Sequence, residues 1–158
     1  MKIPLRRAVE KVVADQVLPC DAVPMTSRVS HTSVDSRNAY TQSLFWAEVL
    51  GYSENPEDPN EPGHEECLLY SPDRRHRILF IEVPEQKTVK NRLHFDLRPT
   101  DLSQEDEVER LLRLGASVHA DLRSDDAGWV TMLDPEGNEF CVLRSELDVG
   151  DPLAFPSA

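Results

Sequence analysis

The sequence has few cysteines, no long apolar run and a deficit of positive charge. Among its 158 residues only Cys20, Cys67 and Cys141 are cysteines, in no metal-binding spacing, so a disulfide framework is not expected. No stretch approaches the ~20 apolar residues of a membrane span. Residues 1–7 lack the apolar core and cleavage site of a signal peptide. The cytoplasm is therefore the expected location.

The shortage of positive charge limits the classes of partner. The chain has 17 Lys and Arg against 29 Asp and Glu, a net charge of −12. Nucleic acids and anionic membranes require concentrated Lys and Arg, so neither is expected as a partner. The same charge is typical of an acidic soluble surface, and it would also attract a cationic small ligand. Gly-rich phosphate loops, Gly-x-Ser-x-Gly elbows and Cys-x-x-Cys pairs are lacking, so nucleotide-binding, serine-hydrolase and dithiol functions have no support.

The length and composition predict one globular domain with flanking segments. The chain is long enough to bury a core, and its 39% hydrophobic and 29% charged residues are ordinary. Residues 1–27 are expected to form an amphipathic helix and a linker, because apolar residues recur at helical spacing over 5–17. Residues 28–145 form the expected domain, and 146–158 an irregular tail.

One strand–helix unit occurs twice in this domain. A β-type run at 28–34 contains His31, and a second at 91–97 contains His94 in strict alternation of apolar and polar residues. Each run is followed by helical residues that end at Leu-Gly, at nearly the same distance from the histidine. Helices are expected at 39–50 and 104–114, with further strands at 67–70, 77–83, 117–120, 129–133 and 139–143. Residues 134–137 match a type I turn between the last two strands.

Four of these segments resemble the vicinal oxygen chelate superfamily, which contains glyoxalases, bleomycin-resistance proteins and ring-cleaving dioxygenases. The glyoxalase-like single-domain branch is the most similar, through residues 45–51, 91–97, 112–116 and 129–142. The resemblance implies an α+β fold of two βαβββ modules, at about 28–84 and 91–145. They would form a curved mixed sheet, a cup-shaped open barrel with helices outside, and often a homodimer.

The resemblance also implies a site. Metal-using members place ligands on the first and last strands of each module, and these positions fall on His31, Glu82, His94 and Cys141. Cys141 stands where metal-dependent glyoxalases carry a glutamate. His31, Glu82 and His94 are thus the expected ligands of a divalent ion such as Zn, Ni, Fe or Mn, with Glu82 also catalytic.

Three functions remain open from the sequence. The first is a metal-assisted lyase or isomerase that acts on a small oxygenated substrate, with Trp46, Asp96, Trp129 and Cys141 as substrate contacts. The second is a metal-free protein that sequesters a ligand, as in the bleomycin-resistance branch, for which the net charge suggests a cationic ligand. The third is an accessory domain without chemistry, which assembles through the N-terminal helix.

Overall fold

The computed structural model describes residues 27–124 and 127–149. In chain order the elements are β1 (Thr32–Ser36), α1 (Ala39–Leu50), β2 (Glu66–Tyr70), β3 (Arg77–Glu82), β4 (Asp96–Leu97), α2 (Gln104–Leu114), β5 (Ser117–Asp121), β6 (Val130–Leu133), β7 (Glu139–Val142) and α3 (Glu146–Val149). The α+β class and the strand–helix–strands order of both units are thus confirmed. Residues 1–26, which include the expected N-terminal helix, lie outside the described residues.

The first unit forms a mixed sheet of three strands in the order β1-β3-β2. β1 runs parallel to β3, and β2 runs antiparallel to it. An isolated bridge between Ser53 and Tyr70 extends the edge beyond β2. Helix α1 begins and ends where its caps predict, because the Asn38 side chain accepts the Thr41 N–H and Gly51 adopts the left-handed conformation.

The second unit is a complete βαβββ module whose four strands have the order β4-β7-β6-β5. The turn at 134–137 closes with the Gly137 N–H donating to the Asp134 carbonyl, as expected for the hairpin between β6 and β7. Strand β4 is shorter than the predicted run at 91–97, because only Asp96 and Leu97 pair with β7. Leu93, which alternates with the core residues Phe95 and Leu97 in the sequence, is 88% exposed.

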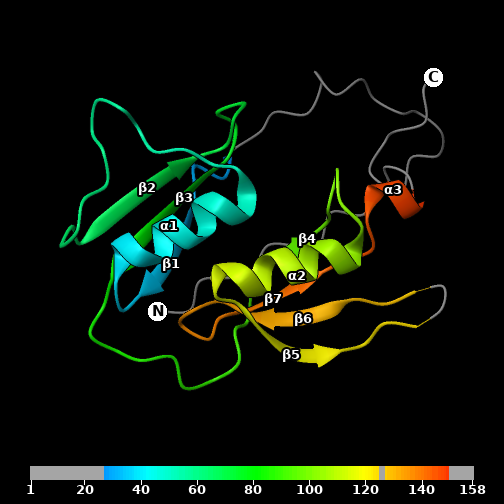
Figure 1. Cartoon of the computed structure of the whole chain (residues 1–158). Helices are drawn as coiled ribbons and strands as arrows, with labels where there is room; N and C mark the ends of the chain where they lie inside the picture. The colour runs from blue at the N-terminus through cyan, green and yellow to red at the C-terminus, as the bar shows by residue number, and fades with distance from the viewer. Residues whose placement is uncertain (1–26, 125–126, 150–158) are drawn as a thin grey trace, which may run out of the picture.

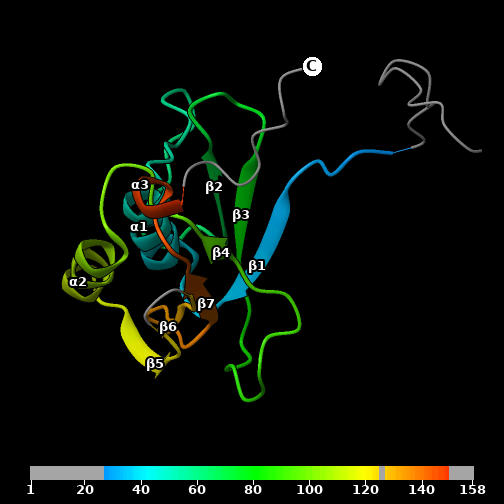
Figure 2. The same ribbon diagram turned by 90° about the vertical axis from the view of Figure 1, so that its right-hand side faces the viewer.

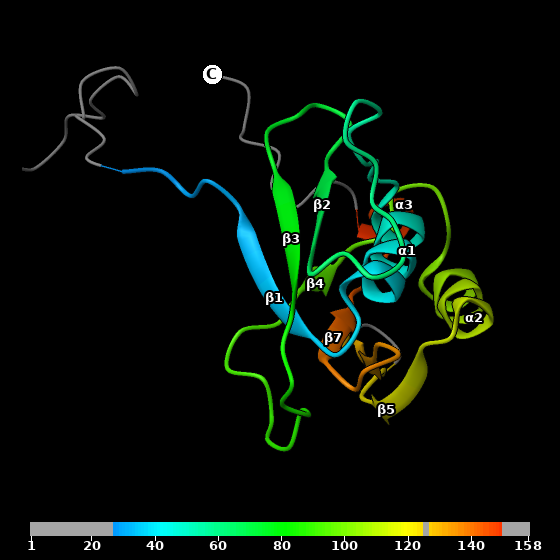
Figure 3. The ribbon, with the colours of Figure 1, turned by 90° about the vertical axis from the view of Figure 1, so that its left-hand side faces the viewer.

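The two units form separate sheets within the described residues, and these sheets do not close into a barrel. The expected single curved sheet is therefore corrected to one three-stranded and one four-stranded sheet. Figure 1 shows α1 and α2 side by side in front of the two sheets. Figures 2 and 3 show, from opposite sides, that α1 and α2 lie on the side of the molecule away from β1 and β3.

The hydrophobic core lies between the helices and the sheets. Trp46 and Val49 of α1 and Leu111 of α2 are buried against Phe80 of β3 and Phe140 of β7. Burial of such side chains stabilises by roughly 1.5–3 kcal/mol each. In each sheet, one face therefore packs on the helices, and the opposite face does not contribute to this core.

Two smaller findings complete the fold. A short helix, α3, occupies the start of the segment expected to be an irregular tail. No helix among the described residues has the length and apolar character that crossing a membrane requires.

Candidate functional site

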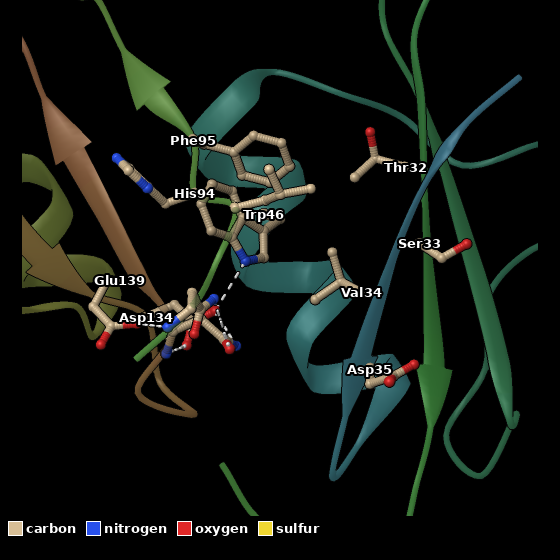
Figure 4. A pocket seen from close by; sticks show the side chains of 12 residues that line it. Thr32, Ser33, Val34, Asp35, Trp46, His94, Phe95, Asp134 and Glu139 are labelled. Atoms are coloured by element: carbon tan, nitrogen blue, oxygen red, sulfur yellow. Dashed lines mark hydrogen bonds between the residues drawn. The ribbon is translucent and has the colours of Figure 1, made fainter. Parts of the chain in front are cut away.

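A cleft of about 430 Å³ lies between β1 and the segment that leads into β4. Apolar side chains of Val34, Trp46, Leu93 and Phe95 line it, together with polar groups that include Thr32. Figure 4 shows Thr32 and Val34 on one side of the cleft and Trp46 and Phe95 on the other. This volume and this mostly apolar lining with a few polar groups are typical of small-molecule sites.

Trp46 lines the cleft and is fixed by contacts from several directions. It is 2% exposed, and its ring packs edge-on against Phe95 and Phe140 at 5.2 and 5.3 Å between centroids. Its ring N–H donates to the carboxylate of Asp134 at 3.3 Å, the dashed line in Figure 4. The expected contact between Trp46 and substrate therefore falls on a rigid residue that lines a cleft.

Asp134 joins the two modules at this point. Its buried carboxylate accepts hydrogen bonds from the side chains of Trp46 and Gln42 on α1 and from the backbone N–H groups of Glu136 and Asn138 in the turn. The carboxylate thus fixes the β6–β7 turn on α1. The sequence indicates Asp134 as a turn residue, but nothing in its local pattern indicates the partners on α1.

A cluster of three metal-capable side chains joins the segment that leads into β4, β4 itself and β7. The donor atoms of His94, Asp96 and Cys141 all lie within 4.8 Å of one another, and the His94 Nε2 is 3.3 Å from the Asp96 Oδ1. Asp96 and Cys141 are paired in register across β4 and β7, so their side chains share a face. Phe140 and Val142 face the core, so the cluster occupies the sheet face opposite to the helices.

His94 belongs to both the cleft and the cluster. It lines the cleft, but in Figure 4 its imidazole is directed away from Thr32 and Val34. The segment that carries His94 and Phe95 therefore makes contacts in two directions. Phe95 packs on Trp46, while His94 faces Asp96.

Cys141 is the buried member of the cluster. The thiol is 3.8 Å from the Thr131 hydroxyl, and the residue is 7% exposed. Burial raises the pKa of the thiol; the hydrogen bond with Thr131 opposes this, and the neighbouring Asp96 carboxylate adds to the rise. The thiol is therefore protonated at neutral pH, and binding of a metal by its sulfur would release that proton.

Glu139, two residues before Cys141 on β7, is already engaged. Its Oε2 accepts from the Lys87 ammonium and from the Asn91 backbone N–H, both at 3.0 Å. Burial raises the pKa of this carboxyl, but the bonds from Asn91 and Lys87 outweigh it and lower the pKa to about 2. Glu139 is thus an ionised partner of the linker between the modules. No sequence pattern indicates a role for Lys87 or Asn91, because that role depends on how the linker folds back on β7.

The structure does not bring His31 and Glu82 together. In the β1–β3 register Glu82 lies opposite Ser36, five residues along from His31, which is roughly 16 Å at 3.3 Å per residue. Glu82 also shares its sheet face with the core residue Phe80. His31 lies just before β1, although a strand was expected over 28–34, and alternation continued back from Ser33 would put it on the opposite face. His31 is exposed, and the described part of the chain contains no group of three metal-capable side chains other than His94, Asp96 and Cys141.

Trp129 lies just before β6 and is 41% exposed. The alternation Trp129, Thr131 puts it on the same sheet face as Cys141, which pairs with Thr131. It therefore stands beside the cluster on the open face and not in the core, a position that suits a ligand contact.

Comparison with known proteins gives one family and a set of similar folds. The model of a glyoxalase-like domain matches residues 31–143. No curated protein matches the sequence. Among solved structures, a mutant of the fosfomycin resistance protein FosX from Listeria monocytogenes, complexed with Mn(II) and 1S,2S-dihydroxypropylphosphonic acid, is 14% identical, with a TM-score of 0.57 and coverage of 80% of this chain and 96% of that one.

Two further structures have the same fold. A glyoxalase/bleomycin resistance protein/dioxygenase family enzyme from Burkholderia phytofirmans PsJN is 21% identical, with a TM-score of 0.52 and coverage of 72% of this chain and 94% of that one. Hypothetical protein SA1046 from S. aureus is 14% identical, with a TM-score of 0.53 and coverage of 76% and 99%. At these identities the similarity extends to the fold alone.

Proposed function

Because this chain belongs to the glyoxalase-like domain family of the vicinal oxygen chelate superfamily, we propose that it binds a small oxygenated molecule at the His94 cluster, with a divalent metal ion as cofactor. The observation that carries this proposal is the convergence of an imidazole, a carboxylate and a thiol within 4.8 Å on one sheet face. Three protein ligands that leave further positions open are the pattern of catalytic zinc sites.

The donor set fits a zinc-type ion. The 3.3 Å between His94 Nε2 and Asp96 Oδ1 suits two ligands of one ion, since zinc bonds to N and O of about 2.0–2.2 Å require ligand atoms at roughly this separation. A thiolate from Cys141 favours zinc over magnesium or calcium. Bound there, the ion would act as a Lewis acid that stabilises negative charge on a substrate oxygen, as a lyase or isomerase requires.

The chain's own residues would hold and orient the ligand. His94 and Asp96 present their polar atoms on the open face, and Trp129 provides an exposed aromatic surface on the same face. The expectation that Glu82 is a ligand gains no support from the register. His94 stays a proposed ligand, whereas Asp96 and Cys141, expected as substrate contacts, are proposed as ligands instead.

We further propose that a second copy of the chain completes the site. On the first sheet, the face opposite to the helices carries Leu68, Leu79 and Ile81, which are only half-buried in one chain. Alternation places His31 on this same face. If this face of a second copy covered the open face of the second sheet, it would enclose the His94 cluster in a cup and bring His31 of the partner subunit towards the cluster.

Metal analysis tests the cofactor. Protein purified without a histidine tag should contain about one zinc, nickel or iron ion per chain, and the His94→Ala/Cys141→Ala double variant should contain none. Affinity for the ion should rise with pH, because the Cys141 thiol must lose its proton. The proposal is wrong if the purified protein contains no metal and added divalent ions do not change its melting temperature.

A metal-free binding protein is the second candidate, and the net charge of −12 favours it. A thermal-shift screen discriminates the two candidates. Salt-sensitive stabilisation by cationic metabolites without metal supports binding, and equal shifts with neutral metabolites remove the electrostatic reason.

A further inference from the structure

The linker between the modules, residues 83–95, contains no strand, yet it delivers His94 to the cluster. Hydrogen bonds to β7 hold the linker both before and after residues 92–94; the bond at Asn91 is the near anchor and the bond at Phe95 is the far anchor. On the far side, the Phe95 carbonyl accepts the Cys141 N–H at 2.8 Å, and on the near side the Asn91 N–H donates to Glu139 at 3.0 Å. Only three residues span the two anchors, so the position of His94 depends on both of them.

A single carboxylate oxygen makes the two shortest bonds of the near anchor. Glu139 Oε2 accepts hydrogen bonds from the Asn91 backbone N–H and from the Lys87 ammonium. The side-chain amide of Asn91 also donates to Asn138 Oδ1 at 3.3 Å. Glu139 is 9% exposed, so these bonds form in a largely desolvated place, where charge-assisted bonds are strong. We name the bonds of Lys87 and Asn91 to Glu139 the Glu139 latch.

We propose that Glu139 is a positioning residue: it is no metal ligand, and it fixes the linker so that His94 faces Asp96 and Cys141. This inference rests on the proposed function of the cluster. Glu139 is a carboxylate on the strand that carries Cys141, but its bonded oxygen is already committed to Lys87 and Asn91. The chain thus uses a glutamate on its last strand to place a ligand and uses a cysteine as the ligand.

Graded variants separate the parts of the latch. Glu139→Gln keeps an acceptor for the Asn91 N–H but removes the charge, whereas Glu139→Leu removes both bonds, and Lys87→Met removes only the ammonium. Residues that orient metal ligands typically change metal affinity by 10–100-fold when mutated. We expect about 10-fold weaker Co²⁺ binding for Glu139→Gln and Lys87→Met, and a larger loss for Glu139→Leu. Glu57→Gln, an exposed substitution outside the linker, serves as the matched control.

Two readouts on the full chain decide the outcome. The first is the thiolate-to-cobalt absorption band, titrated with Co²⁺. The second needs no metal: nuclear Overhauser contacts between the His94 ring and the Cys141 side chain should be present in the native protein and weakened in Glu139→Leu. Contacts between Trp46 and Phe140 should persist in the variant, which shows that the core is intact.

The outcomes separate the inference from the proposed function. If the native protein shows the His94–Cys141 contacts but binds no Co²⁺, the metal proposal fails, and the contacts alone decide for or against the latch. If Glu139→Leu keeps the His94–Cys141 contacts unchanged, Glu139 is merely structural and the inference is overturned. Unchanged Co²⁺ affinity in Glu139→Leu, with the native protein binding Co²⁺ through Cys141, overturns it equally.

Discussion

Replacing Asp134 by alanine should destabilise the protein more than a typical surface change does. The carboxylate is 4% exposed and accepts from Trp46 Nε1 at 3.3 Å, from the Gln42 side chain, and from the backbone N–H groups of Glu136 and Asn138 at 3.0 and 2.8 Å. Its removal leaves the donors of Trp46 and Gln42 buried without this partner.

The magnitude follows from these two donors. A buried donor left without an acceptor costs roughly 1–3 kcal/mol, so the pair costs about 4 kcal/mol. Since a domain of this kind is stable by about 5–15 kcal/mol, Asp134→Ala would remove a large part of the free energy of unfolding. Asp134→Asn keeps one carbonyl acceptor and should cost roughly half as much.

Urea unfolding followed by tryptophan fluorescence and near-UV circular dichroism measures the effect. Glu57→Ala, at an exposed position, should stay within about 0.5 kcal/mol of the native protein. A cost below about 1 kcal/mol for Asp134→Ala would refute the view that this carboxylate joins the modules and fixes Trp46.

Three other predictions concern stability. Arg110→Ala should cost about 2–3 kcal/mol in urea unfolding, because Arg110 donates to two α1 carbonyls and to the buried Glu107; a loss below about 0.5 kcal/mol contradicts this. Gly128→Ala should lower the melting temperature far more than Gly63→Ala. Both glycines have positive φ, but a Cβ at 128 would clash with the Leu122 carbonyl oxygen, so equal shifts in melting temperature would refute the clash. The Glu139 pKa of about 2 lies below its ordinary value of 4.5, so the stability that the ionised carboxylate contributes is present above about pH 4.5 and is lost as the pH falls towards 2. Glu139→Gln should flatten this part of the profile of stability against pH, and an unchanged profile argues against the ion pair.

Much of the fold could be predicted from local patterns. The Asn38 and Gly51 caps bound α1 as expected, and the Asp134 to Gly137 turn forms where its residue types indicate. These features depend on contacts a few residues apart, which sequence spacing records. The separation into two sheets depends on which strands β1 and β4 pair with, namely β3 and β7. These pairings join residues far apart in the sequence, so no local pattern encodes them.

The site was less predictable for the same reason. His94 and Cys141 could be proposed from the strand positions that the resemblance implies, but Asp96 joins them because it pairs with Cys141 in the β4–β7 register. The placement of Glu82 depended on the β1–β3 register, which sets it opposite Ser36 and away from His31. A shift in strand register moves a side chain along the sheet or to its other face, and the sequence alone does not fix it.

The proposed function requires that His94, Asp96 and Cys141 of one chain hold a single divalent ion. Crystals of untagged protein grown with zinc, measured at the zinc absorption edge, test it most directly. One anomalous peak per chain should lie within bonding distance of His94 Nε2, an Asp96 oxygen and Cys141 Sγ. A peak bound by His31 and Glu82 without Cys141, or no peak at the cluster, would contradict it.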